Sequence, residues 1–287
     1  MTIEVFIPAY NCRNTLSKTL ASLAAQTDPD FYVCVVDDCN DEPLDHICDM
    51  FPQLNLRIIR NSENRGCGLS RQSAIDTSSA DYLIPLDSDD MLLPMAVHVF
   101  KQEAVLHPDV DFFVSWVYNE TPNSSGGTAY NIITNGYTLV SGKMYRAEFL
   151  RNYDIRNCNE FSRFADDTYI NMLSYELGKT AMIPIPLYLY THNLNSVTNT
   201  NGGRDYWADV VPKFLRCIEA TCSIICRHKP ADSIAHLENT LPYIRDVVTL
   251  RNQPQEILAY NALLESLQRM GRTKNLTQVG LEMQYDS

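Results

Sequence analysis

Short apolar runs separated by polar, turn-rich segments dominate the first 120 residues. The runs predict strands at residues 3–7, 31–36, 54–59, 82–86 and 110–117. Between the first two runs, Leu16, Leu20 and Leu23 recur at helical spacing. Further helices are predicted over 69–77 and 94–106, the second beginning with Pro94 as a first-turn proline. This alternation predicts an α/β fold with a mainly parallel sheet flanked by helices.

The rest of the chain is patterned differently. Residues 119–136 are polar and turn-rich, which predicts a loop, and residues 183–190 form another apolar segment. From residue 205 onward, apolar residues follow 3- and 4-residue spacing, which predicts helices. They form one stripe of Trp207, Val210, Val211, Phe214, Leu215 and Ile218, and a second, after Pro254, of Ile257, Leu258, Leu263, Leu264 and Leu267. We therefore expect an α/β domain over 1–204 and a C-terminal helical region over 205–287.

The composition indicates an ordinary globular protein of the cytoplasm. The 287 residues are 45% hydrophobic and 20% charged, and no window approaches 18 uninterrupted apolar residues. The first eight residues lack the basic segment of a signal peptide. Nine cysteines without disulfide-like spacing indicate reduced thiols. Cys217, Cys222 and Cys226 are candidate metal ligands, but the helical spacing of the last two favours burial in a core.

The charge balance restricts the class of ligand. The formal net charge is −12, and no basic stripe is present that would bind a phosphate backbone, so we expect no nucleic-acid partner. An acidic protein that binds an anionic nucleotide needs local help from a cation or from helix N-termini.

Polar residues cluster where the predicted strands end. Asn11 follows the first strand, Asp37 and Asp38 follow the second, and Asp87-Ser88-Asp89-Asp90 follows the strand at 82–86. Ligands of parallel α/β sheets bind outside the carboxyl ends of the strands. The acids at 87–90 are therefore candidates for holding a divalent cation, and the pair at 37–38 for accepting hydrogen bonds from a nucleoside. The alternative for both groups is a solvated or helix-capping turn.

Two further segments contain residues suited to catalysis or metal binding. Asp166-Asp167 opens a predicted helix over 168–177, where a carboxylate could act as a general base or simply cap the helix. A second carboxylate nearby would raise the pKa of such a base. His192 and Ser196 follow the apolar segment at 183–190, and are candidates for metal and phosphate contact or for a solvated loop.

Seven segments in order resemble family-2 glycosyltransferases with the GT-A fold. They are Phe6-Ile7-Pro8-Ala9-Tyr10-Asn11, Val35-Val36-Asp37-Asp38, Asn64-Arg65-Gly66 with Arg71, Leu86-Asp87-Ser88-Asp89-Asp90, Gly142-Lys143-Met144-Tyr145-Arg146, Asp166-Asp167, and Tyr190 with His192 and Ser196. The resemblance spans about residues 1–200, with 1–118 as the nucleotide-binding half and 119–204 as the acceptor-binding half. Cys39-Asn40, Gln72 and Asp166 depart from the usual Gly-Ser, Asn and Glu.

The resemblance implies a role for each matched residue. The nucleotide, most often uridine diphosphate, would contact Pro8, Ala9, Tyr10, Asp38, Arg71, Asp87 and Ser88. Asp89 and His192 would hold Mn²⁺ or Mg²⁺, Asp166 and Ser196 would support the diphosphate or the surrounding site, and Asp167 would be the catalytic base.

The activity implied is transfer of a sugar from a nucleotide diphosphate donor, UDP-linked by preference, to a hydroxyl of a saccharide, lipid-linked or protein acceptor. The expected mechanism is single displacement with inversion, in the setting of polysaccharide biosynthesis. The alternatives are a nucleotidyltransferase and a catalytically inactive nucleotide-sugar-binding protein. For the C-terminal stripes we expect packing within the chain first, a homodimer second, and weak peripheral association with the inner face of the membrane third.

Overall fold

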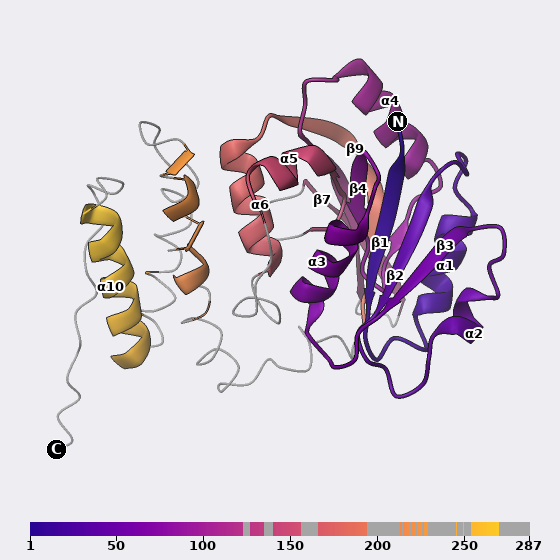
Figure 1. Ribbon diagram of the computed structural model, residues 1–287, viewed down its shortest axis with the longest axis horizontal. Coiled ribbons are helices and arrows are strands. Elements are labelled where there is room, and N and C mark those ends of the chain that lie inside the picture. The colour runs from indigo at the N-terminus through magenta and orange to yellow at the C-terminus, as the bar shows by residue number, and fades with distance from the viewer. Residues whose placement is uncertain are drawn as a thin grey trace. The chain divides into compact units, whose positions relative to one another are not determined.

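The protein is described here by a computed structural model (Figure 1) that covers residues 1–122, 127–134, 140–155 and 166–193, helical residues within 213–249, and residues 254–269. The chain divides into two compact units, Met1–Ser196 and Val197–Ser287. The boundary expected at residue 204 and the candidate Ser196 lie outside the described residues.

The first unit is built on a mixed nine-stranded sheet. Its strands are β1 (Ile3–Ala9), β2 (Tyr32–Asp37), β3 (Asn55–Arg60), β4 (Tyr82–Pro85), β5 (Met91–Leu92), β6 (Phe112–Pro122), β7 (Thr128–Ile133), β8 (Lys143–Arg146) and β9 (Thr180–Tyr190). The order is β3-β2-β1-β4-β8-β6-β9-β5, and β7 pairs with β6. The first four strands of that order run parallel, whereas β8 is antiparallel to both of its neighbours. The predicted α/β class and mainly parallel sheet are confirmed, with antiparallel strands added beyond β4.

Helices cover both faces of this sheet, as Figure 1 shows. They are α1 (Leu16–Ala24), α2 (Asp45–Cys48), α3 (Cys67–Thr77), α4 (Ala96–Leu106), α5 (Ala147–Asn152) and α6 (Asp166–Leu177). Buried residues of α1, α2 and α4 join the core with alternate residues of β1, such as Val5 and Ile7. Phe6 faces the other side, where it meets Ile75 of α3, Leu150 of α5 and Ile170 of α6. Because β1 is buried on both faces, its sequence is apolar except for Glu4, which is buried and paired with Arg57.

Two expectations about local structure are wrong. The helix expected to begin at Pro94 is α4, which begins at Ala96 after the cap residue Met95. The loop expected over 119–136 is largely the hairpin formed by β6 and β7, in which Val117 to Pro122 pair with Thr128 to Ile133. Most residues of β7 are exposed, so this strand has the polar composition of a loop although its backbone is paired.

The described residues of the second unit are helical, as predicted. Leu215 and Ile218 are buried, and helix α10 (Pro254–Arg269) buries Ile257, Leu263, Leu264 and Leu267. Leu258, which was assigned to the same stripe, is 59% exposed. Trp207, Val210, Val211 and Phe214 lie outside the described residues, as do Cys222 and Cys226. Over the described part of the chain, no helix has both the length and the apolar character that crossing a membrane requires.

Candidate active site

The turns that follow β1 and β2 are joined by one side chain, Asn40. Its amide nitrogen donates to the carbonyl of Ala9 at 2.8 Å and to Asp37 Oδ1 at 2.7 Å, and its amide oxygen accepts the backbone N–H of Asn11 at 2.7 Å. Cys39 has φ 65°, in the left-handed region that favours glycine, which explains why glycine is usual at this position of the family motif. The turn containing Pro8, Ala9 and the exposed Tyr10 is therefore fixed to the end of β2.

Asp38 holds the turn that precedes α3. Its carboxylate accepts the backbone N–H of Arg65 at 2.9 Å and of Gly66 at 2.8 Å, and the side-chain amide of Asn61 at 2.8 Å. Gly66 has φ 84° and ψ 164°, a conformation essentially restricted to glycine. Asp38 is 2% exposed, so its charge is used to order this turn.

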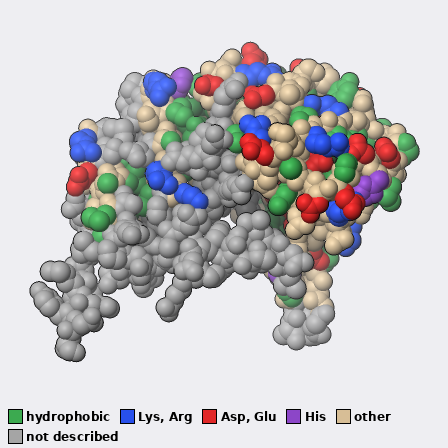
Figure 2. All heavy atoms as spheres, turned by 60° about the horizontal axis from the view of Figure 1, so that its bottom comes forward, with side chains coloured by type: hydrophobic (Ala, Val, Ile, Leu, Met, Phe, Trp, Pro, Cys, Tyr) green, Lys and Arg blue, Asp and Glu red, His purple; other side chains and the backbone are tan. Residues whose placement is uncertain are grey.

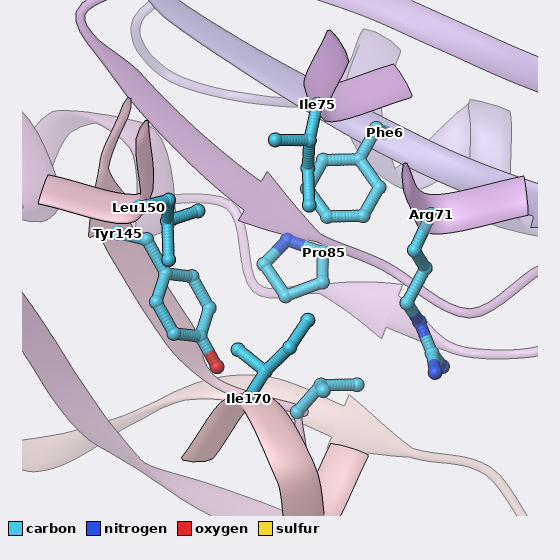
Figure 3. A pocket seen from close by; sticks show the side chains of 8 residues that line it. Phe6, Arg71, Ile75, Pro85, Tyr145, Leu150 and Ile170 are labelled. Atoms are coloured by element: carbon cyan, nitrogen blue, oxygen red, sulfur yellow. The ribbon is translucent and has the colours of Figure 1, made fainter. Parts of the chain in front are cut away.

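Arg71 of α3 connects the end of β4 to the start of α6. Its buried guanidinium is paired with Asp87, at 2.6 Å, and with Asp166. Figure 3 shows Arg71 beside a narrow apolar space lined by Phe6, Pro85 and Ile170, with its guanidinium directed away from Pro85. The apolar space is part of the packing beneath the site. The two ion pairs of Arg71 bring together Asp87 and Asp166, which are 79 residues apart in the chain.

Asp167, next in sequence to Asp166, has a different environment. It is half-buried, and its Oδ1 accepts the backbone N–H of Thr168 at 2.7 Å. The pKa of Asp167 is raised to about 7, chiefly by burial and next by the negative charge of Asp166, while Arg71 acts in the opposite direction. A carboxylate with this pKa can take up a proton near neutral pH.

The acidic segment after β4 is bonded to the end of β9. Asp90 accepts the hydroxyl of Tyr188 at 2.7 Å and the backbone N–H of Thr191 at 2.8 Å. Asp89 accepts the side-chain amide of Asn193 at 2.8 Å, and burial raises the pKa of Asp89. The possibility that Asp90 caps the following helix is wrong, because Met95 occupies the cap position of α4.

The remaining sequence-derived candidates lie at the same edge. Ser88 bonds the thiol of Cys12, which follows β1, and burial raises the pKa of that thiol to about 11. The backbone N–H of His192 donates to Glu120 of β6 at 3.1 Å. The structure thus brings together the turns that contain Ala9, Asp38, Asp87 to Asp90, Asp166 and His192. Ser196, the remaining candidate, lies outside the described residues.

Several residues that the motifs did not single out contribute to this edge. Asn40, Tyr188, Asn193 and Glu120 form the hydrogen bonds described above. Lys143 of β8 is fully buried, and burial lowers its pKa to about 7, opposed by the negative charge of Asp167. The only sequence signal for Lys143 was its place in the quoted segment 142–146, next to the apolar Met144 and Tyr145.

The surface around the strand ends has no extended patch of one charge in the view of Figure 2. Acidic and basic side chains are interspersed in the right-hand part of that view. Negative groups of a ligand at this edge would therefore be neutralised locally rather than by a broad basic surface.

Comparison with known proteins identifies the family of the chain. The model of "Glycosyl transferase family 2" matches residues 4–169, more than half of the sequence. The chain belongs to glycosyl transferase family 2. The matched region contains every segment described above except the end of β9.

The chain is similar to parts of other glycosyltransferases. An uncharacterized glycosyltransferase of Haemophilus influenzae is 31% identical over 110 residues, covering 38% of this chain and 37% of the relative. A chondroitin synthase of Pasteurella multocida is 31% identical over 139 residues, covering 47% of this chain and 14% of the relative. This chain therefore matches well under half of either protein.

Solved structures share the GT-A fold of the first unit. Residues 1–349 of Staphylococcus aureus TarS, in complex with UDP-GlcNAc, superpose with a TM-score of 0.76 at 20% identity, covering 94% of this chain and 83% of that chain. GalNAc-T7 with UDP, GalNAc and Mn²⁺ gives a TM-score of 0.57 at 14% identity, covering 76% of this chain and 48% of that chain. At sequence identities of 20% and 14%, these structural similarities establish a shared fold and nothing more.

The residues of the site fit a divalent cation of the kind that GT-A enzymes of this family commonly use. His192 Nε2 is buried and has no hydrogen-bond partner among the described residues. Asp89 supplies a carboxylate that is bonded to Asn193, the residue next to His192. No group of three or more His, Cys, Asp or Glu side chains suited to a metal occurs in the described ranges. Two protein ligands are nevertheless sufficient for Mg²⁺, which is commonly held by one or two side chains together with substrate phosphates.

Proposed function

We propose that the chain transfers a sugar from a UDP-linked donor to an acceptor hydroxyl by single displacement with inversion. The observation that supports this best is the contrast within one pair of acids. Asp166 is paired with Arg71, whereas Asp167 lies beside it without an ion pair among the described residues and has a pKa raised to about 7. Such a residue suits a general base placed next to a site for an anionic leaving group.

The donor would lie across the ends of β1, β2 and β4. Pro8, Ala9 and Tyr10 would contact the nucleoside, in a turn that Asn40 fixes to Asp37. Asp38 would act chiefly by ordering the 64–66 turn. Asp87 and Ser88 would face the ribose and diphosphate, with Arg71 aligning Asp87.

The reaction transfers one proton and exchanges one bond at the anomeric carbon. Asp167 accepts the proton of the acceptor hydroxyl while the acceptor oxygen forms a bond to the anomeric carbon from the side opposite the diphosphate. The bond from that carbon to the diphosphate oxygen breaks, and its electron pair leaves with UDP. A Mn²⁺ or Mg²⁺ ion held by Asp89 and His192 would offset the charge on the diphosphate. The acceptor, a saccharide, lipid-linked or protein hydroxyl, would bind through residues 119–204 in the cytoplasm.

The test uses water as the acceptor, because it requires no knowledge of the natural one. The protein is incubated with UDP-GlcNAc, UDP-glucose or UDP-galactose and Mn²⁺, and UDP release is measured. We expect slow release from at least one donor, loss of release in Asp89→Ala, and no further effect of EDTA on that variant. UDP binding with no release from any donor would contradict an enzymatic function, and metal-dependent release by Asp89→Ala would contradict the metal ligand.

A further inference from the structure

The two segments proposed to hold the metal are connected by a group of buried hydrogen bonds. Tyr188 of β9 donates its hydroxyl hydrogen to Asp90 Oδ2 at 2.7 Å, and its oxygen accepts the backbone N–H of Asp87 at 3.2 Å. Asp90 Oδ1 accepts the backbone N–H of Thr191 at 2.8 Å. The acid segment is therefore bonded to the strand end on both sides of Asp89.

These bonds are shielded from water. Tyr188 has no exposed surface and Asp90 is 1% exposed. The strands themselves are paired here, since β5 begins one residue after Asp90 and Leu92 is opposite Tyr188. Hydrogen bonds to a buried carboxylate resist exchange with water, so this connection can fix the distance between the two segments.

His192 lies between two residues that contact the acid segment. Thr191 is bonded through its backbone to Asp90, and Asn193 is bonded through its side chain to Asp89. The backbone N–H of His192 is bonded to Glu120. The backbone of His192 is thus restrained on three sides, while its buried Nε2 is left without a partner among the described residues.

We propose that Asp90 and Tyr188 are positioning residues that set metal affinity by holding His192 at a fixed distance from Asp89. Neither residue touches the metal or the sugar. Their hydrogen bonds replace the flexibility of two loops with a rigid pair of ligand positions, so that little ordering remains to be done when the cation and diphosphate bind. This inference rests on the proposed function, because it needs the metal to be held by Asp89 and His192.

The test measures Mn²⁺ binding directly, with the full chain, by the electron paramagnetic resonance signal of free Mn²⁺ in the presence of saturating UDP. The principal variant is Tyr188→Phe, which keeps the ring and removes both hydrogen bonds of the hydroxyl. Asp90→Asn is the second, because it keeps the shape but replaces one acceptor oxygen with a donor. Metal affinity is expressed per folded protein, at a temperature below the Tm of every variant.

Two control variants make similar changes at the opposite end of the sheet. Asp111 accepts the backbone N–H of Lys179 at 3.0 Å, immediately before β9, so Asp111→Asn alters a carboxylate that bonds the start of the same strand. Tyr82 is a buried tyrosine at the beginning of β4, with Arg146 at 4.9 Å over its ring. Tyr82→Phe therefore removes a tyrosine hydroxyl far from the acid segment.

We expect Tyr188→Phe and Asp90→Asn to weaken Mn²⁺ binding by about 10- to 100-fold, the usual effect of losing such a supporting contact. UDP affinity without metal should be unchanged, saturating Mn²⁺ should restore most of the UDP release, and both controls should bind Mn²⁺ as the wild type does. Wild-type Mn²⁺ affinity in Tyr188→Phe, or an equal loss of Mn²⁺ affinity in Tyr82→Phe, would overturn this inference and leave the proposed function standing. Absence of Mn²⁺ binding by the wild type with UDP would overturn both the inference and the metal of the proposed function.

Discussion

Of the three pairs of adjacent aspartates at this site, Asp37-Asp38 and Asp166-Asp167 have contrasting surroundings. Asp37 is the last residue of β2 and Asp38 follows it, and each carboxylate accepts hydrogen bonds from three donors of the chain. In the pair that opens α6, Asp166 is bound by Arg71 and Asp167 receives hydrogen-bond donors only from Thr168 among the contacts described. The same dipeptide therefore orders turns in one place and leaves a carboxylate available for proton transfer in the other.

The difference comes from the donors supplied by the surrounding elements. The turn at 64–66 directs two backbone N–H groups at Asp38, and Asn61 adds a third donor. At α6, Arg71 bonds Asp166, and among the described residues no arginine bonds Asp167. Burial raises the pKa of both carboxyls, but only Asp166 forms the ion pair with Arg71. The pKa of Asp167 is raised to about 7, which is the property needed of a base near neutral pH.

The largest expected effect separates the two pairs by activity. Asp167→Asn keeps the shape and the hydrogen bond to Thr168 but cannot accept a proton, so sugar transfer should fall by about 10²- to 10⁴-fold. UDP affinity, measured by calorimetry with Mn²⁺, should stay near that of the wild type. Asp76→Asn, on the surface of α3, is the control. An equal loss of UDP affinity would place Asp167 at the nucleotide instead, and unchanged transfer would exclude it as the base.

The next effect is on stability and belongs to the first pair. Asp38→Ala leaves the N–H groups of Arg65 and Gly66 without their acceptor, so the free energy of unfolding should fall by about 2–3 kcal/mol. Urea denaturation followed by circular dichroism measures this loss. Asp41→Ala, an exposed aspartate three residues later, should change stability by less than about 0.5 kcal/mol. Equal stability of the Asp38 and Asp41 variants would contradict the ordering role of Asp38.

The smallest effect concerns the stability of Asp167→Asn as a function of pH. Because the pKa of Asp167 is raised in the folded protein, the stability associated with its protonated form is lost as pH rises through about 7. At pH 8 the asparagine variant should therefore melt higher than the wild type, by about 2–4 °C for each kcal/mol gained. At pH 5, where Asp167 is protonated in the folded state, the difference should largely vanish. A variant that melts lower than the wild type at pH 8 would show that the ionised carboxylate is stabilised rather than strained.

The strands near the site could be predicted from the sequence because their burial is visible in their own residues. Strands β1, β2 and β4 are buried on both faces, so each is a mostly apolar run, interrupted in β1 by Glu4, that leads into polar residues at the ligand-binding edge. The β6–β7 hairpin was not predicted, since β7 is mostly exposed and its polar residues have the composition of a loop. Burial on both faces produces a clear signal, whereas an exposed strand does not.

The candidate acids could also be found from the sequence, but their partners could not. Tyr188 and Asp90 are separated by 98 residues, and Arg71 and Asp166 by 95. No periodicity or local motif relates residues so far apart, and their contact follows from how β9 and α6 pack in the fold. The distinction between a carboxylate that orders a turn and one that is free to accept a proton therefore required the structure.

The pH dependence of sugar transfer tests the role of Asp167 most directly. UDP release is measured between pH 5.5 and 8.5 at saturating UDP-sugar and Mn²⁺, so that binding does not limit the rate. Because Asp167 must be ionised to act as a base, the rate should rise about tenfold per pH unit below its pKa and level off above about pH 7. Asp167→Asn should lose this rise and keep only a low rate throughout. A wild-type rate that is constant from pH 5.5 to 8.5, or the same rise in Asp167→Asn, would contradict the assignment of Asp167 as the base.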